Sequence, residues 1–222
     1  MRREIGRRCI LFGLILCWGG LPLWAKEGRS PEVFVTVAVH NRADIPANTL
    51  AQAELTAGSI FNEAGVEVHW VNCEPGVDAA LKIAPSCRVT EFPKHLQLTI
   101  ARRSKSLTDS VFGISYLGKD GSGCYSTVFF EPAEELHERL HVNLGTLLGH
   151  VVAHEIAHLL LGTNSHSDSG IMRPHWNERD LANAGKGELL FTQAQSQTMR
   201  ARLAATLCRT ASAWLRAEAA KD

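Results

Sequence analysis

The stretch His154-Glu155-Ile156-Ala157-His158 decides how the rest of the chain folds around it. Two histidines four residues apart lie on one face of an α-helix, about 40° apart in azimuth and about one turn apart along the axis. Both imidazoles can therefore reach one tetrahedral zinc ion. Glu155 lies about a quarter-turn away, close enough to contact a water molecule at the metal but poorly placed to bind the metal itself.

A catalytic zinc site has three protein ligands and one open position, so a third ligand is needed. If the helix continued to His166, that residue would lie about 12 Å beyond His158 along the axis. Gly162 predicts an earlier end, because glycine readily takes the left-handed conformation at a helix C-terminal cap. Residues 163–165 then turn the chain, so that His166 can return to the metal.

An HExxH motif, a helix-ending glycine, a third histidine and a nearby Gly-Ile-Met sequence together resemble the metzincin clan of zinc peptidases. Ser167, directly after the third histidine, is similar to the matrixin branch. Residues 154–172 carry the resemblance strongly, and the rest of the chain only in outline. The usual spacing H-x-x-G-x-x-H is lengthened here by one residue on each side of Gly162.

The resemblance implies an α+β, metzincin-like zincin fold. In this fold a twisted mixed β-sheet lies over a buried zinc-binding helix, and a small C-terminal subdomain ends in a closing helix. It implies that His154, His158 and His166 bind Zn²⁺ and that Glu155 is the general base. Met172 is then the Met-turn residue, which packs beneath the ligands without touching the metal.

Glu178 is the alternative third ligand. It lies 20 residues after His158, which is similar to the gluzincin arrangement, where a downstream helix supplies the third ligand. Pro174 and two later glycines leave little room for the long helix that this arrangement needs. The sequence therefore favours His166 and otherwise interprets residues 177–180 as a polar turn.

Other residues near the motif are interpreted more plainly. His150 lies one turn before His154, but ligands at i, i+4 and i+8 span about 12 Å, too far for one ion. We therefore expect His150 to lie outside the ligand set. His175 can approach the cleft, although the sequence gives this little weight, and Trp176 is interpreted as core packing.

Residues 1–25 are typical of a secretory signal, with four arginines before an apolar segment at 9–18 that glycine and proline interrupt. The apolar run is shorter than the roughly 20 residues of a membrane span. We expect cleavage, no stable membrane span afterwards, and a secreted or periplasmic protein. An uncleaved anchor is the alternative. Residues 26–222 then form one catalytic domain.

The charge balance argues against a nucleic-acid partner. Residues 1–25 hold four of the 23 Lys and Arg residues and one of the 23 Asp and Glu residues, which leaves 19 and 22 and a net charge of −3. The sequence contains no basic patch or tail. We expect a monomer that acts on a peptide or protein.

Four cysteines follow the signal, at Cys73, Cys87, Cys124 and Cys208. An even number in an exported protein predicts two disulfides, for which three pairings are possible. Cys73 and Cys87 flank a segment containing proline and glycine and are expected to close that loop, which leaves Cys124 with Cys208. Buried free thiols are the alternative.

Hydrophobic periodicity predicts alternating strands and helices. A strand, a helix and a second strand at the start predict a parallel, right-handed unit. The helix that carries the histidines is apolar on nearly all sides, so we expect it to be buried. The expected elements are strands at 33–40, 66–71, 95–101, 113–118 and 124–130, and helices at 46–64, 132–141 (with Pro132 first), 143–161 and 193–215.

The strand expected at 113–118 is the candidate substrate edge. In the clan that the chain resembles, an edge strand just before the zinc helix binds the substrate backbone by β-augmentation. An ordinary hairpin is the alternative interpretation. The candidate residues are Gly113, Ile114, Ser115, Tyr116 and Leu117.

The sequence therefore predicts an exported zinc-dependent endopeptidase, a hydrolase. Zn²⁺ polarises the scissile carbonyl and binds the attacking water, and Glu155 takes a proton from that water and later delivers one to the leaving amine. Two other classes stay open: a zinc-binding module without peptidase activity, and a hydrolase of another amide, such as a cell-wall peptide cross-link. No second metal is expected.

Overall fold

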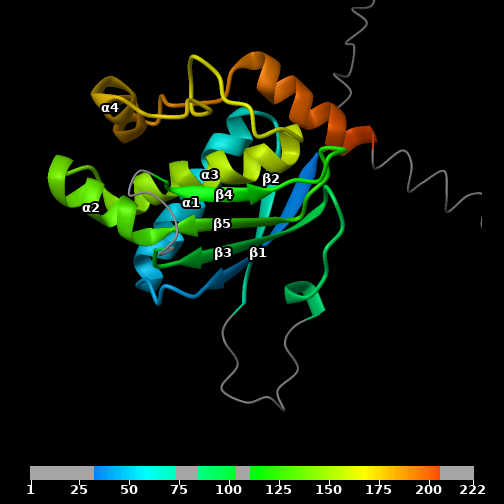
Figure 1. The fold of residues 1–222 in the computed structure, drawn as a ribbon, viewed down its shortest axis with the longest axis horizontal. Coiled ribbons are helices and arrows are strands. Elements are labelled where there is room, and N and C mark those ends of the chain that lie inside the picture. The colour runs from blue at the N-terminus through cyan, green and yellow to red at the C-terminus, as the bar shows by residue number, and fades with distance from the viewer. Residues whose placement is uncertain (1–32, 74–84, 104–110, 206–222) are drawn as a thin grey trace, which may run out of the picture. The chain divides into compact units, whose positions relative to one another are not determined.

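The computed structural model describes residues 33–73, 85–103 and 111–205 (Figure 1). The signal expected at residues 1–25 lies outside this part of the chain. The elements are β1 (Phe34–Asn41), α1 (Ala47–Glu63), β2 (Glu67–Asn72), the 3-10 turn η1 (Pro85–Cys87), β3 (His95–Ala101), β4 (Gly113–Tyr116), β5 (Tyr125–Phe129), α2 (Phe130–Leu140), α3 (Leu144–Leu161) and α4 (Glu178–Lys186). A further helix follows over residues 193–205.

The five strands form one mixed sheet in the order β2-β1-β3-β5-β4. β1 pairs in parallel with β2 and with β3, and β3 pairs in parallel with β5. β4 runs antiparallel to β5 and forms one edge of the sheet. The expected α+β class, the mixed sheet and the parallel pairing across the first helix are therefore confirmed.

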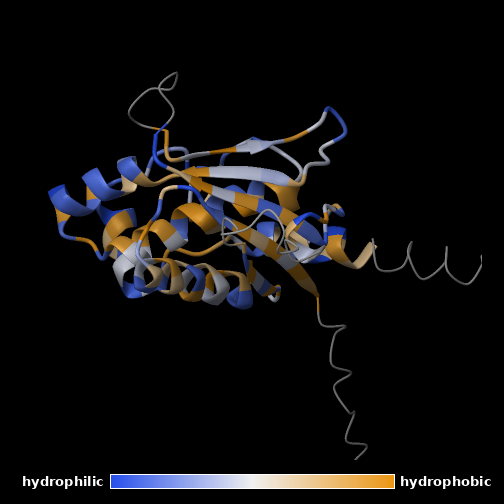
Figure 2. Ribbon diagram, turned by 90° about the horizontal axis from the view of Figure 1, so that it is seen from below, coloured by the Kyte–Doolittle hydropathy of each residue, from blue (hydrophilic) through white to orange (hydrophobic). Residues whose placement is uncertain are grey.

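Helix α3 is the centre of the hydrophobic core. It packs against α1, β4 and β5, and Figure 2 shows the helices gathered on one side of the sheet. Among the described residues, α3 is the one helix long and apolar enough to cross a membrane, and 78% of that segment is buried inside the protein. Burial on all sides explains why its sequence shows no polar face.

Two glycines on α3 bring its backbone close to α1. A Cβ on Gly145 would lie 2.7 Å from Cβ of Gln52, and one on Gly149 would lie 2.6 Å from the carbonyl oxygen of Ala53. Real Cβ contacts are longer, so only glycine fits at these two positions without a shift of α1. The close approach fixes α3 relative to the rest of the core.

Two helices begin differently from the expectation. α2 begins at Phe130 rather than at Pro132, which lies within the first turn, where a missing N–H breaks no helical hydrogen bond. The polar turn expected at residues 177–180 is in fact the start of α4. Asn177 and Asp180 form a capping box there, in which each side chain accepts a hydrogen bond from the other residue's backbone N–H.

The closing helix begins where the sequence predicts. The backbone N–H of Thr192 donates to the side chain of Gln195, and the backbone N–H of Gln195 donates to the hydroxyl of Thr192. This reciprocal pair caps the helix of residues 193–205. The rest of the expected helix, to residue 215, lies outside the described residues.

The cysteines form one disulfide in the described part of the chain. Cys73 and Cys87 are joined, with their Cα atoms 5.8 Å apart, as expected. The expected second disulfide is not formed at Cys124, whose thiol is free. Cys124 packs half-buried against the hydrophobic core, so it acts as a small apolar side chain. Cys208 lies outside the described residues.

Candidate metal centre and active site

Helix α3 is capped at both ends, and Gly162 ends it as the sequence predicts. The Asn143 side chain accepts a hydrogen bond of 2.9 Å from the backbone N–H of Thr146 at the start of the helix. Gly162 has φ = 71° at the C-terminal cap, and its N–H donates to the carbonyl of His158. A residue with a Cβ is strained at this φ, so glycine allows the chain to leave the helix here.

Three imidazoles meet beside the C-terminal half of α3. The ring nitrogens that His154, His158 and His166 can offer to a metal all lie within 4.8 Å of one another. The three ring centroids are 4.8, 5.3 and 5.0 Å apart, so each ring neighbours both of the others. The structure thus brings His166 back to the two helix histidines. Glu178, at the start of α4, is exposed and lies outside this group.

The hydrogen bonds of the helix histidines fix which ring nitrogen is free. Nδ1 of His154 lies 2.8 Å from the carbonyl oxygen of Ile171, and Nδ1 of His158 lies 2.8 Å from that of Thr163. A carbonyl only accepts, so each Nδ1 carries the hydrogen. In a neutral ring the Nε2 atom then bears a lone pair, which is the form that binds a metal.

Electrostatics favour the neutral rings. Burial lowers the pKa of His154 to about 4, and it also lowers the pKa of His158. The two Nε2 atoms are 3.1 Å apart, so two lone pairs face each other without a hydrogen between them. A tetrahedral zinc with Zn–N bonds of about 2.0–2.1 Å places its nitrogens roughly 3.3 Å apart, so the donor set fits this ion.

His166 completes the group from the solvent side. Its side chain is exposed, in contrast to the two buried helix histidines. Partial burial lowers its pKa, and the neighbouring His175 lowers it further. A neutral imidazole is again the favoured form at neutral pH, so all three rings can act as nitrogen ligands.

Glu155 is buried beside the histidines. Burial raises the pKa of its carboxyl to about 7, and a hydrogen bond from Ser115 partly opposes this rise. The Ser115 hydroxyl lies 2.7 Å from Oε2 of Glu155. A carboxyl that titrates near neutral pH can accept a proton in one step of a reaction and return it in another.

A cavity of about 330 Å³ opens next to these groups. His154, Glu155 and His166 form one wall of it. The rest of the lining is mostly apolar, with polar side chains near the loop that follows Met172. These residues are Val111, Phe112, Gly113, Leu136, Val151, Arg173, Pro174, His175 and Trp176. The reactive groups therefore share one cavity with a surface that can hold an organic ligand.

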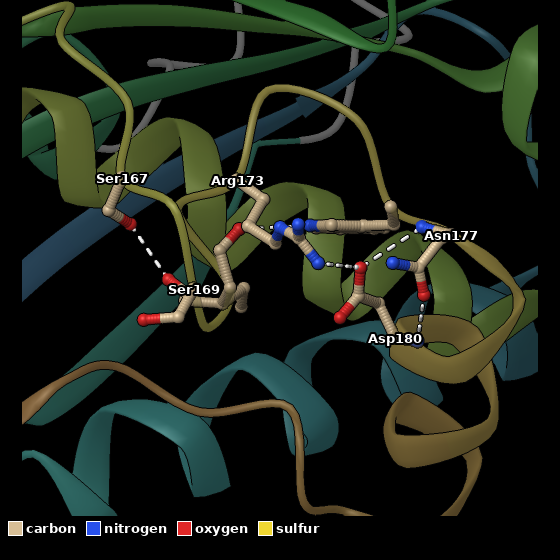
Figure 3. Close-up of polar contacts among 7 residues, drawn as sticks. Ser167, Ser169, Arg173, Asn177 and Asp180 are labelled. Atoms are coloured by element: carbon tan, nitrogen blue, oxygen red, sulfur yellow. Dashed lines mark hydrogen bonds and ion pairs between the residues drawn. The ribbon is translucent and has the colours of Figure 1, made fainter.

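Hydrogen bonds and an ion pair hold both ends of the loop after His166 in place (Figure 3). The Ser167 hydroxyl donates to the carbonyl of Ser169, and the Ser167 N–H donates to the carbonyl of Met172. Arg173 bonds Asp180 at 3.0 Å, within the cap of α4. Met172 is completely buried. The loop is thus a fixed turn, as expected at this position, and α4 holds its far end.

The carbonyl of Ile171 connects this turn to the histidines. It accepts from Nδ1 of His154 at 2.8 Å and from Nε1 of Trp176 at 3.0 Å. The Trp176 ring also meets the rings of His154 and His150 edge-on, at 6.0 and 6.2 Å. His150 is buried, bonds the carbonyl of Thr146 and lies outside the ligand group, as expected.

Several site residues were missed or undervalued by the sequence reasoning. Trp176 lines the cavity rather than only packing in the core, and His175 lines it as well. Ser115 was expected only as part of a substrate edge, yet its side chain contacts Glu155. The period of two along a strand places residues 113 and 115 on one face, which was the available signal.

The candidate substrate edge lies where the sequence predicts. β4 is an outer strand of the sheet, Gly113 at its start lines the cavity, and Tyr116 at its end is 53% exposed. Leu117 follows just beyond the strand. One side of β4 pairs with β5, so the backbone groups on its other side have no strand partner among the described residues.

No protein-family model and no curated protein matches this sequence. A zinc-dependent peptidase from Methanocorpusculum labreanum is similar in structure, with a TM-score of 0.47 and 14% identity over 73% of this chain and 99% of that chain. Similarity at this level does not establish a shared fold or activity.

Proposed function

We propose that this chain is an exported, zinc-dependent endopeptidase of the metzincin type. The observation that carries the proposal is the meeting of two unprotonated imidazole nitrogens 3.1 Å apart, with a third imidazole beside them and a buried carboxyl on the same cavity wall. Such a set of groups is needed to hold a zinc ion and move a proton next to it.

His154, His158 and His166 are the metal ligands in this proposal. A zinc ion held by them would supply Lewis-acid chemistry to the hydrolysis. The backbone carbonyls behind the two helix histidines orient the rings and select the tautomer that binds metal. Met172 is completely buried in the loop that follows His166, and it is our Met-turn residue.

Glu155 is the general base and then the general acid. Its carboxyl is held on one oxygen by Ser115 and lies at the cavity wall. It accepts a proton from the attacking water and delivers one to the leaving amine. In the metal-free protein, burial raises the pKa of this carboxyl to about 7, so its protonated and ionised forms are close in free energy at neutral pH.

The substrate is a peptide or protein segment in extended conformation. Its backbone pairs with the outer side of β4, from Gly113 to Tyr116, and continues past Leu117. One of its side chains enters the cavity, whose apolar lining includes Leu136 and Val151. The protein acts outside the cytoplasm, and the disulfide between residues 73 and 87 agrees with an oxidising compartment.

The test compares wild type with Glu155→Gln after loading with zinc. Wild type should cleave a denatured protein, and Glu155→Gln should keep its zinc while kcat falls by about 10²- to 10⁴-fold. The proposal is wrong if both proteins cleave equally, or if neither cleaves while both retain zinc. The second result would indicate a zinc-binding module without peptidase activity.

A further inference from the structure

Two residues of β4 face the carboxyl of Glu155. Gly113 and Ser115 are separated by one residue, so both lie on the same face of the strand, and this face meets α3. Ile114 and Tyr116 lie on the opposite face by the same alternation. On the face that meets Glu155, Gly113 therefore leaves space without a side chain and Ser115 supplies a hydroxyl.

Gly113 provides the room in which the Glu155 side chain lies. A Cβ built on Gly113 would be 2.5 Å from Cγ, 2.6 Å from Cδ and 2.7 Å from Oε1 of Glu155. These distances are far inside van der Waals contact. The carboxyl therefore lies directly against the strand backbone, with Oε1 on the side of Gly113, which lines the cavity.

Ser115 holds the other carboxyl oxygen. Its hydroxyl is 2.7 Å from Oε2 of Glu155 and 2.6 Å from the backbone oxygen of the same residue. A hydroxyl has one hydrogen to give. The backbone oxygen lies inside α3 and already accepts a helical hydrogen bond. The hydrogen of Ser115 therefore goes to the carboxylate, the stronger acceptor.

A second hydroxyl supports the first. Ser126 of β5 lies opposite Ser115 in the antiparallel register, and the two Oγ atoms are 3.2 Å apart. Ser115, Ser126 and Glu155 are all buried, with exposed fractions of 7%, 2% and 6%. The Ser126 Oγ also lies 3.3 Å from the carbonyl oxygen of Ile114. Side chains in a buried hydrogen-bond network of this kind have little freedom to rearrange, so they fix the position of the carboxyl.

We propose that Ser115, supported by Ser126, is a positioning residue for the reaction: it holds Oε2 of Glu155 so that Oε1 faces the cavity, where it takes the proton of the attacking water. The inference rests on the proposed peptidase function. Ser115 does not touch the substrate through its side chain and does not bind the metal. Its effect is confined to the orientation of Glu155.

The expected effect of losing this hydroxyl follows from the strength of a hydrogen bond to a charged group. Ser115→Ala should lower kcat by about 10- to 100-fold. KM and zinc content should stay close to wild type, because neither substrate contacts nor ligands change. Ser115→Cys keeps the shape of the side chain but carries a larger atom that donates weakly, so kcat should fall at least as much as in Ser115→Ala.

The test measures kcat, KM and zinc content for these variants and for Ser115→Thr, which restores a hydroxyl. Ser115→Thr should recover most of kcat. Tyr125→Phe is the matched control, since it removes an exposed hydroxyl from β5 and should leave kcat unchanged. An unchanged kcat in both Ser115→Ala and Ser115→Cys would overturn the inference, as would an equal loss in the control.

A second readout does not depend on turnover. Thermal unfolding of the metal-free protein is measured for Ser115→Ala, for Glu155→Ala and for the double variant. Ser115→Ala should lower Tm in the wild-type background and have a smaller effect when Glu155 is absent, because the two side chains interact directly. Additive effects would refute the contact. An inactive wild type that holds zinc would instead refute the proposed function, and the positioning role with it.

Discussion

Gly113→Ala should separate the activity of this protein from its stability. The new Cβ would lie 2.5 Å from Cγ of Glu155, whereas carbon atoms in contact are about 3.5–4.0 Å apart. The Glu155 side chain must therefore move away by roughly 1–1.5 Å, because β4, which carries residue 113, is held in place by its pairing within the sheet. A misplacement of about 1 Å in a catalytic group can lower the rate by about 10²-fold.

The free energy of unfolding should fall only modestly. The atoms that must move belong to a side chain rather than to backbone, and overpacking of this kind costs about 1–3 kcal/mol. Part of this is offset because alanine restricts the unfolded chain more than glycine does. We therefore expect kcat to fall by about 100-fold while the free energy of unfolding falls by no more than about 2 kcal/mol.

The assay pairs peptide hydrolysis with denaturant unfolding, and the chain offers a matched control. A Cβ on Gly185 in α4 would meet nothing within 4 Å, so Gly185→Ala should leave kcat unchanged and stabilise the helix by up to about 1 kcal/mol. A Gly113→Ala protein with kcat within about threefold of wild type would refute the position assigned to Glu155. A loss of activity that tracks unfolding would refute it as well.

Three further outcomes follow. Gly149→Ala should lower the free energy of unfolding by about 1–3 kcal/mol in a denaturant titration, because its Cβ would meet the backbone of α1 at 2.6 Å. In the metal-free protein, burial lowers the pKa of His154 to about 4 and raises that of Glu155 to about 7. As pH falls, His154 takes up its proton at a higher pH in the unfolded chain than in the folded chain, which lowers the free energy of unfolding. Glu155 takes up its proton at a higher pH in the folded chain than in the unfolded chain, which raises the free energy of unfolding. The two effects on the free energy of unfolding oppose each other in wild type. Between pH 6.5 and 4, the free energy of unfolding should fall by about 2 kcal/mol more in Glu155→Gln than in wild type, measured by denaturant titration at each pH. Removing the disulfide by Cys73→Ser should cost about 3 kcal/mol, as expected for a loop closed over a sequence separation of 14.

The parts of the fold that could be predicted depend on local chemistry. Asn143 and Gly162 cap α3 where the sequence places its ends, because each acts on backbone groups within its own turn. The return of His166 followed from the position of Gly162. The strands were found because their residues alternate or form short apolar runs. The pairing of Cys73 with Cys87 was favoured because the two residues flank one short segment.

The misses depend on contacts between residues far apart in sequence. Ser115 and Glu155 are 40 residues apart, and only the order of the strands places β4 beside α3. The number of cysteines does not say which of them lie close together, so it could not show that Cys124 packs in the core as a free thiol. The start of α4 was a different kind of miss, because the residues of its capping box were visible as a motif.

Metal analysis of the purified protein, combined with X-ray absorption at the zinc edge, tests the central claim most directly. We expect one zinc per chain, bound by three imidazole nitrogens at about 2.0–2.1 Å, and loss of that zinc in His166→Ala but not in Glu178→Ala. A carboxylate in place of the third imidazole, retention of zinc by His166→Ala, or a protein that binds no zinc would contradict it.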